Sequence, residues 1–361
     1  MIVVAALIVA LVQAAKTVTV PITKTAFAKP VTRTQKMLSE YHHARMEQKF
    51  ESMIELLPYD STLGKLRLQQ QQASIELANN LNLAYVGPVL FGTPLQPESA
   101  QGYVYDTGSG YLTTTSTNCQ TCSSNAYNPA ASTTAGGSEL TTKQLDYGSA
   151  SLKGYLGSDQ VCLASEMCVN NFQFFVITWQ SGLSGYDGIL GLSPPDEAQN
   201  GPSYTKALYS QGIIDKEEVT FWLNFYGNET STATFGGVPA NATVGKTFSQ
   251  DLYSRYDQWW TVKMHNVEYG GTDIKNSGIA YAILDTGTSL LYLGTQDYNA
   301  FVSELTKSVP ELDCTSNIYC FSKDFTCDQL TPRMKPLMIN LQENYYTLPP
   351  EAYTFSRSNL F

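Results

Sequence analysis

The sequence Asp-Thr-Gly occurs twice, 179 residues apart, and each copy follows a run of apolar residues. Asp106-Thr107-Gly108 follows residues 102–105, and Asp285-Thr286-Gly287 follows residues 279–284. Short apolar runs of this kind predict strands, and Asp-Thr-Gly predicts a tight turn that leaves the strand. One copy alone would be an ordinary turn. Two copies in matching contexts, one in each half of the chain, predict a duplicated lobe that brings two aspartates to a common axis.

Six further segments occur along the chain in the order typical of one known family. They are residues 85–94 (YVGPVLFGTP), 127–133 (YNPAAST), 147–151 (YGSAS), 186–192 (YDGILGL), 235–238 (FGGV) and 259–262 (WWTV). Together with the two Asp-Thr-Gly motifs, they make the chain resemble the pepsin-like aspartic endopeptidases from about residue 16 to its C-terminus.

The resemblance implies an all-β, bilobal fold, and the pattern of the sequence agrees with it. Short apolar runs alternate with Gly, Asn, Ser and Thr, which predicts mostly antiparallel sheets with few helices. We expect the first lobe at residues 77–242 and the second at residues 243–361. The two helices that we expect lie at residues 203–211 and 295–308.

Asp106 and Asp285 are the catalytic residues that the resemblance implies, acting on polypeptide substrates. Two facing carboxyl groups cannot both ionise at low cost, so the pair would share one proton. The ionised aspartate would act as general base on a water molecule, and the protonated one would donate a hydrogen bond to the scissile carbonyl. This chemistry requires no metal and no cofactor. His265 is the sole histidine beyond residue 43, so a Ser-His-Asp triad finds little support.

Three pairs of residues are expected to support the two aspartates in the same way in each lobe. A hydroxyl beside each aspartate would hydrogen-bond across the axis, and a second hydroxyl would bind the outer carboxylate oxygen. A glycine without a Cβ would let the backbone approach the water closely. In this order, the pairs are Thr107 and Thr286, Ser109 and Thr288, and Gly108 and Gly287.

Tyr147 stands where the family has the tyrosine of its flap, a hairpin over the substrate. The alternative is an aromatic residue that packs on its own sheet, since the chain has 23 Tyr. Thr113 stands where the family often has a Trp that receives the hydroxyl of this tyrosine. We therefore expect the flap to be held differently here.

The first residues of the chain resemble a signal peptide. Residues 2–12 are an unbroken apolar run that is too short to span a bilayer, and small residues follow it. Lys and Arg are absent ahead of the run, and an uncleaved anchor is the alternative. We expect a signal peptide at residues 1–15, entry into the secretory pathway, and a lysosomal, vacuolar or extracellular destination without stable membrane association.

The charge of the chain is unevenly distributed. Residues 1–84 contain 9 Lys or Arg and 6 Asp or Glu, whereas residues 85–361 contain 13 and 26. A basic segment ahead of an acidic body predicts an intramolecular partner, and residues 16–76 resemble the family's inhibitory pro-segment. We expect a monomeric zymogen that is cleaved near residues 72–82. The net charge of −10 argues against a nucleic-acid partner.

Seven cysteines and two sequons fit a secreted chain. Cysteines close in sequence predict disulfides there, namely Cys119–Cys122 and Cys162–Cys168, although a C-x-x-C sequence is also compatible with a redox or zinc site. Cys314, Cys320 and Cys327 cannot all pair with one another, so their pairing stays open. Asn228 and Asn241 begin N-glycosylation sequons.

One element of the duplicated plan lacks its second copy. Ile189-Leu190-Gly191 ends 85 residues after Asp106, and the family pairs this element with the strand that bears the aspartate. Its counterpart would lie 85 residues beyond Asp285, whereas the sequence ends at Phe361. We therefore expect a second lobe that is incomplete at its C-terminus. The alternative function is a catalytically impaired, peptide-binding pseudoprotease.

Overall fold

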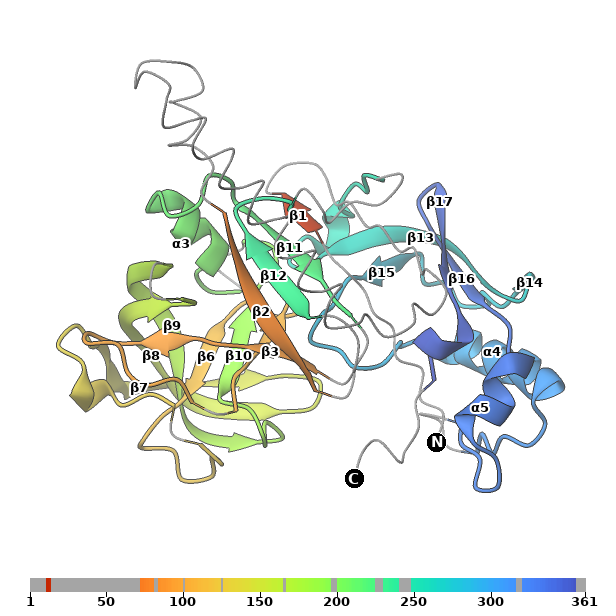
Figure 1. The fold of residues 1–361 in the computed structure, drawn as a ribbon, viewed down its shortest axis with the longest axis horizontal. Helices are drawn as coiled ribbons and strands as arrows, with labels where there is room; N and C mark the ends of the chain where they lie inside the picture. Colours follow the sequence, from red (N-terminus) through yellow and green to blue (C-terminus); the bar gives the residue numbers. More distant parts are fainter. Residues whose placement is uncertain are drawn as a thin grey trace, which may run out of the picture.

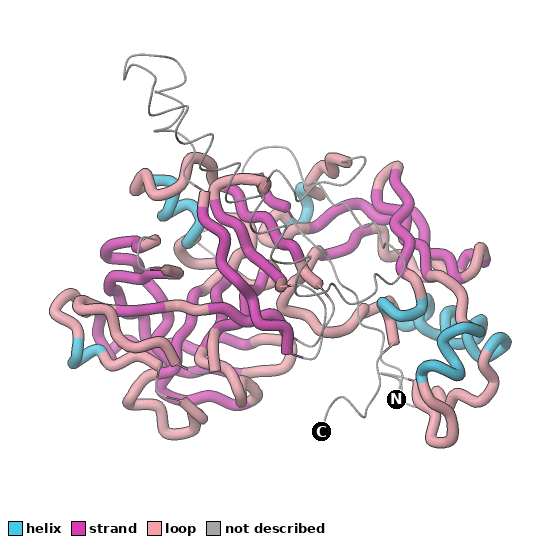
Figure 2. The backbone as a smooth tube through the Cα atoms, in the orientation of Figure 1, coloured by secondary structure: helices cyan, strands magenta, loops and turns pink. Residues whose placement is uncertain are grey.

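The computed structural model describes two hydrophobic cores, each formed by one half of the chain. The described residues are 11–13, 72–80, 84–99, 101–124, 126–164, 167–195, 200–224, 230–239, 248–315 and 320–354. The first core draws its side chains from residues 75–235 and the second from residues 260–353. In Figure 1, the first is the orange-to-green half and the second the cyan-to-blue half. The predicted bilobal, mostly β fold is confirmed; in Figure 2 strands dominate the first half, and the second half combines strands with helices.

The first lobe is built on one large sheet. Among the described residues it has twelve strands. In spatial order they are β1 (Leu11–Gln13), β11 (Glu218–Trp222), β12 (Ser231–Phe235), β2 (Ala73–Asn80), β3 (Ala84–Gly87), β5 (Tyr103–Asp106), β10 (Gly188–Gly191), β6 (Leu112–Thr115), β9 (Cys168–Ser181), β8 (Ser151–Cys162) and β4 (Leu90–Phe91), with β7 (Gly136–Asp146) paired to β8.

β5 carries Asp106 at its end and is held from both sides. β10 runs parallel to it, with Leu190 opposite Tyr105 and Gly191 opposite Asp106, and β3 pairs antiparallel with its other edge. All four residues of β5 and all four of β10 are buried, as expected for apolar strands that are covered on both faces. The sheet therefore fixes the backbone position of Asp106.

The second lobe has a smaller sheet with helices beside it. Within the described residues, five strands form it: β14 (Thr272–Asp273), β13 (Thr261–Tyr269), β16 (Leu337–Leu341) and β17 (Asn344–Leu348) in order, with β15 (Tyr281–Ile283) paired to β13. β15 leads to Asp285, and its residues are only half-buried. Since β13 is its only described strand partner, Asp285 has less sheet around it than Asp106.

The two helices predicted from the sequence are confirmed. α3 (Tyr204–Ser210) begins after Ser203, whose side chain accepts a hydrogen bond from the backbone N–H of Lys206 as an N-cap does. α4 (Thr295–Ser308) buries Asp297, Phe301 and Leu305, which lie four residues apart and so share one face. The remaining helical segments are α5 (Cys327–Leu330) and 3₁₀ turns at Pro129–Ala131, Ser254–Tyr256, Thr331–Arg333 and Pro350–Ala352.

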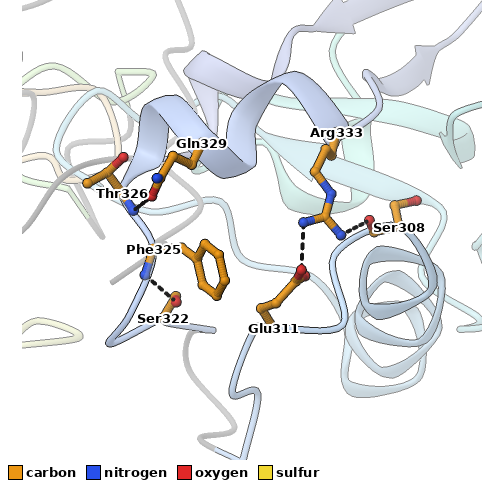
Figure 3. A network of polar contacts seen from close by, with 7 residues as sticks. All are labelled: Ser308, Glu311, Ser322, Phe325, Thr326, Gln329 and Arg333. Carbon is orange, nitrogen blue, oxygen red and sulfur yellow. Dashed lines mark hydrogen bonds and ion pairs between the residues drawn. The ribbon is translucent and has the colours of Figure 1, made fainter.

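A polar network ties the end of α4 to the segment around α5 (Figure 3). Arg333 donates to the carboxylate of Glu311 at 2.7 Å and to the backbone carbonyl of Ser308 at 3.1 Å. A capping box between Thr326 and Gln329 satisfies backbone groups at the start of α5. These bonds hold the helical side of the second lobe together.

Three disulfides are present. The two predicted pairs, Cys119–Cys122 and Cys162–Cys168, are formed. The pairing that the sequence left open is Cys314–Cys320. Cys327 is a free thiol, and burial raises its pKa.

Several predictions fall wholly or partly outside the described residues. Of the predicted signal peptide only residues 11–13 are described, as β1 beside β11, and of the predicted pro-segment only residues 72–76. The predicted boundary between the lobes, residues 242 and 243, and the sequons at Asn228 and Asn241 lie outside. No helix in the described part of the chain combines the length and apolarity needed to cross a bilayer.

Candidate active site

The two Asp-Thr-Gly motifs meet between the lobes through reciprocal hydrogen bonds. The backbone N–H of Thr107 donates to the Thr286 hydroxyl at 3.0 Å, and the N–H of Thr286 donates to the Thr107 hydroxyl at 2.9 Å. Each hydroxyl then donates to a backbone carbonyl of the opposite lobe, that of Leu284 at 2.8 Å and that of Tyr105 at 2.6 Å. Thr107 is completely buried and Thr286 is 7% exposed. Four bonds thus join the strand ends that carry Asp106 and Asp285.

Each aspartate is oriented by its own turn in the same way. The N–H of Gly108 donates to Oδ1 of Asp106 at 2.8 Å, and the Ser109 hydroxyl donates to Oδ2 at 2.5 Å. In the second lobe, Gly287 N–H donates to Oδ1 of Asp285 at 2.8 Å and the Thr288 hydroxyl donates to Oδ2. Each turn therefore supplies one donor to each oxygen of its own carboxyl group and fixes the orientation of that group.

The glycine in each motif makes room for the aspartate of the other motif. A Cβ on Gly108 would lie 2.5 Å from Cγ of Asp285, and a Cβ on Gly287 would lie 2.2 Å from Oδ1 of Asp106. Real Cβ atoms essentially never come this close to another heavy atom. Any larger residue at either position would therefore displace a carboxyl group.

The two carboxyl groups lie close together, since each packs against the glycine of the other motif, and the charge of one acts on the other. Burial raises the pKa of Asp106 to about 7, and the negative charge of Asp285 acts in the same direction, while the bonds from Ser109 and Gly108 oppose it. Because the groups are coupled, this titration belongs to the pair.

Tyr147 lies in the turn between β7 and β8 and is close enough to Asp106 to feel its charge. Burial raises the pKa of its hydroxyl far above the ordinary value, and Asp106 adds to the increase, followed by Tyr111. The turn is closed by a hydrogen bond from Tyr147 N–H to the carbonyl of Ala150 at 2.7 Å. Thr113, in contrast, is completely buried and its hydroxyl accepts from Ile189 N–H at 3.0 Å.

Two contacts that the sequence did not predict join the lobes beside the aspartates. The indole N–H of Trp260 donates to the carbonyl of Leu192 at 2.8 Å, and the Asn200 side chain donates to the carbonyl of Gln258 at 2.9 Å. The motif WWTV marked the segment of Trp260, but no sequence signal identified its partner. Among the described residues, no group of three or more His, Cys, Asp or Glu side chains is arranged to hold a metal ion.

Comparison with known proteins gives the class that this fold and site define. Residues 84–360 match the family model of the eukaryotic aspartyl proteases. A pregnancy-associated glycoprotein of Equus caballus is 31% identical over 291 residues, which cover 77% of this chain and 69% of that protein. Pepsin A of Gallus gallus is 27% identical over 289 residues, which cover 78% of this chain and 73% of pepsin A.

The fold also resembles a solved structure, that of the aspartic proteinase from Irpex lacteus. The two superpose with a TM-score of 0.63 at 21% sequence identity, over 77% of this chain and 79% of that one. The chain therefore belongs to the eukaryotic aspartyl protease family, and the class is that of the aspartic-type endopeptidases.

Proposed function

We propose that Asp106 and Asp285 are the catalytic pair with which this endopeptidase hydrolyses polypeptides. The observation that supports this most strongly is the close approach of the two carboxyl groups, for which the glycine of each motif makes room, with each carboxyl group held by donors of its own turn. A turn with a purely structural role would need neither the partner carboxyl group nor the glycine that makes room for it.

The arrangement supports general acid–base hydrolysis by water. The ionised member of the pair removes a proton from a water molecule as it attacks the scissile carbonyl carbon, and the protonated member donates to the carbonyl oxygen. Collapse of the tetrahedral intermediate breaks the C–N bond, and the pair returns a proton to the leaving amine. Thr107 and Thr286 keep the two carboxyl groups at a fixed separation. Reacting groups that are held in position in this way react faster than groups that must first come together.

Tyr147 is proposed to contact the substrate from the opposite side. Its position in the hairpin turn and its proximity to Asp106 support this role. The turn between β7 and β8 would then cover the peptide while it is bound over the two aspartates.

We further propose that the protein is made as a monomeric zymogen whose basic N-terminal segment is its inhibitor. The position of β2 argues for cleavage at the N-terminal end of the expected region. This strand pairs with β12 and β3 and buries Ile75 and Leu77. A cut at the predicted boundary after residue 76 would divide β2, whereas a cut before Ala73 would preserve it. We therefore place processing at the start of the range of residues 72–82.

A secretory location is the proposed setting for this activity. The three disulfides, which persist in oxidising compartments, support it, as does the apolar run at residues 2–12.

The assay that separates a protease from a peptide-binding relative measures turnover and binding on the same sample. An acid-denatured protein is incubated with the chain at acid pH, and the products are identified by mass. New termini that accumulate with time support the proposal. Stable binding of the substrate without any new termini would favour the pseudoprotease.

A further inference from the structure

β7 is supported along one edge only among the described strands of the first lobe. We call β7, β8 and the turn at residues 147–150 the flap hairpin (Figure 1). β8 is paired on both sides, with β7 and with β9, but β7 pairs only with β8 among the described strands. The register of β7 against β8 also shifts between Gly137 and Thr142. Because β7 has ladder hydrogen bonds along one described edge only, a further side-chain contact with a neighbouring loop adds to the interactions that hold it in place.

Lys143 supplies such a contact near the tip of the flap hairpin. Its ammonium group donates a hydrogen bond to the hydroxyl of Tyr111 at 2.8 Å and lies 4.9 Å from the centre of the same ring. Tyr111 follows Asp106 by five residues, in the loop that leaves β5. The bond therefore runs from the flap hairpin directly to the loop that follows one of the two aspartates.

Tyr111 is held in place through both its backbone and its ring. Its backbone carbonyl accepts from Gly191 N–H at 3.2 Å, and a Cβ on Gly201 would lie 2.5 Å from the Tyr111 ring, so the ring packs flat on backbone. Gly201 has φ of +72°, a conformation that favours glycine. Tyr111 also belongs to the apolar cluster that contains Tyr147 and Leu145 of the flap hairpin. The movable end is therefore Lys143.

We propose that Lys143 and Tyr111 form a tether that holds the flap hairpin down over the aspartates and so sets the affinity for substrate. Both are positioning residues, because they act through the flap hairpin and touch no reacting atom. The effect on substrate affinity rests on the proposed function, whereas the effect on the flap hairpin itself does not. A tether that shifts the population of the closed hairpin changes apparent affinity by the same factor.

Lys143→Met tests the tether, since it keeps the apolar stem and removes the charge and the donor. We expect amide hydrogen exchange at residues 142–147 to accelerate by about twofold to tenfold, the factor that an exposed cation–π contact and one hydrogen bond allow. KM should rise by a similar factor with kcat nearly unchanged. Lys143→Arg should restore both quantities toward the wild-type values.

The Tyr111→Phe variant tests whether Lys143 and Tyr111 act as a pair. It keeps the ring and removes the hydroxyl, so we expect a smaller effect than that of Lys143→Met. Amide hydrogen exchange in the double variant should be no faster than in Lys143→Met alone, because Lys143→Met already removes the contact with Tyr111. Fully additive effects in the double variant would contradict a tether between these two side chains.

Lys153→Met is the matched control. Lys153 lies on the other strand of the same hairpin, and its ammonium group is 5.0 Å from the centre of the Trp179 ring, so it loses a similar contact without involving Tyr111. An equal acceleration of amide hydrogen exchange at residues 142–147 in Lys143→Met and Lys153→Met would overturn the proposal. The exchange measurement decides this even if the wild-type chain proves inactive, so failure of the tether and failure of the proposed function give different results.

Discussion

Asp106 and Asp285 have the same kinds of hydrogen-bond donors but different surroundings. Asp106 is 7% exposed at the end of a strand that is paired on both edges, whereas Asp285 is half-buried and follows a strand with one described partner. The symmetry of the motif therefore extends to the hydrogen bonds of the two aspartates but not to their burial or to the strands around them.

The raised pKa of Asp106 predicts that the folded protein loses stability as the pH rises. An unfolded aspartate has a pKa of about 4, whereas Asp106 in the folded state has a pKa of about 7. Between these values the folded state binds more protons, so the free energy of unfolding falls with increasing pH and levels off above about 7.

Asp106→Asn removes this contribution and can be compared with the wild type in urea unfolding from pH 4 to pH 8. The stability of the variant relative to the wild type should increase across that range and then become constant. Asp324→Asn, at an exposed position of the second lobe, is the control for removal of a carboxylate. Parallel stability curves for Asp106→Asn and the wild type would contradict the assigned pKa.

The residues of the site were predictable because a short local signature specifies them. The aspartate, the hydroxyl beside it and the small residue in its turn stand together in the sequence, twice. The contact between Lys143 and Tyr111 joins residues 32 positions apart. It depends on the register of β7 against β8 and on the Gly201 backbone that lies against the Tyr111 ring. Neither feature produces a recognisable pattern in the sequence.

At the scale of elements, a buried carboxylate anchors the loop that enters each aspartate-bearing strand. Asp187, just before β10, accepts from Gly102 N–H at 2.6 Å and from the Ser99 hydroxyl at 2.8 Å, ahead of β5. Asp297, in α4, accepts from the N–H groups of Asn276 and Ser277, both at 2.6 Å, ahead of β15. The two lobes thus use different elements to make the same kind of contact.

Asp187→Ala and Asp297→Ala should each destabilise the fold by about 1–3 kcal/mol, because the backbone N–H groups of these loops lose the buried carboxylate that accepts from them. Chemical unfolding measures the loss, and the matched Asn variants should lose less because an amide oxygen can replace one carboxylate oxygen. A loss well below 1 kcal/mol in the Ala variants would show that these loops find other partners.

The sequence predicted the bounds of some elements, whereas for others it predicted only the type of element. The helix at residues 295–308 has the predicted bounds because its apolar residues follow helical spacing. The strands before the two aspartates were predicted as equivalents, yet β5 and β15 differ in pairing and burial. Strand pairing is a long-range property, so an apolar run alone does not determine it.

At the scale of the whole molecule, the uneven charge predicts how the zymogen would respond to pH. Residues 1–84 carry an excess of basic groups and residues 85–361 an excess of acidic ones. Protonation of the acidic groups at low pH removes the negative charge that attracts the basic segment. The proposed pro-segment should therefore separate from the body in acid and be cleaved ahead of β2.

Intact mass measured after incubation at neutral pH and at acid pH checks this expectation. Prompt shortening only in acid, with a new N-terminus close to Ala73, is the expected outcome. The same incubation of Asp106→Asn shows whether the chain processes itself, since that variant should stay intact. Full peptidase activity at neutral pH with residues 16–72 still attached would contradict the zymogen proposal.

The proposed catalytic pair is tested most directly by replacing one carboxyl group at a time. Asp106→Asn and Asp285→Asn each remove the shared proton site while keeping nearly the same volume, so folding, followed by circular dichroism, should be retained. We expect cleavage of an acid-denatured protein to fall by at least about a thousandfold in both variants. Substantial turnover by either folded variant would contradict the assignment of Asp106 and Asp285 as the pair that activates water.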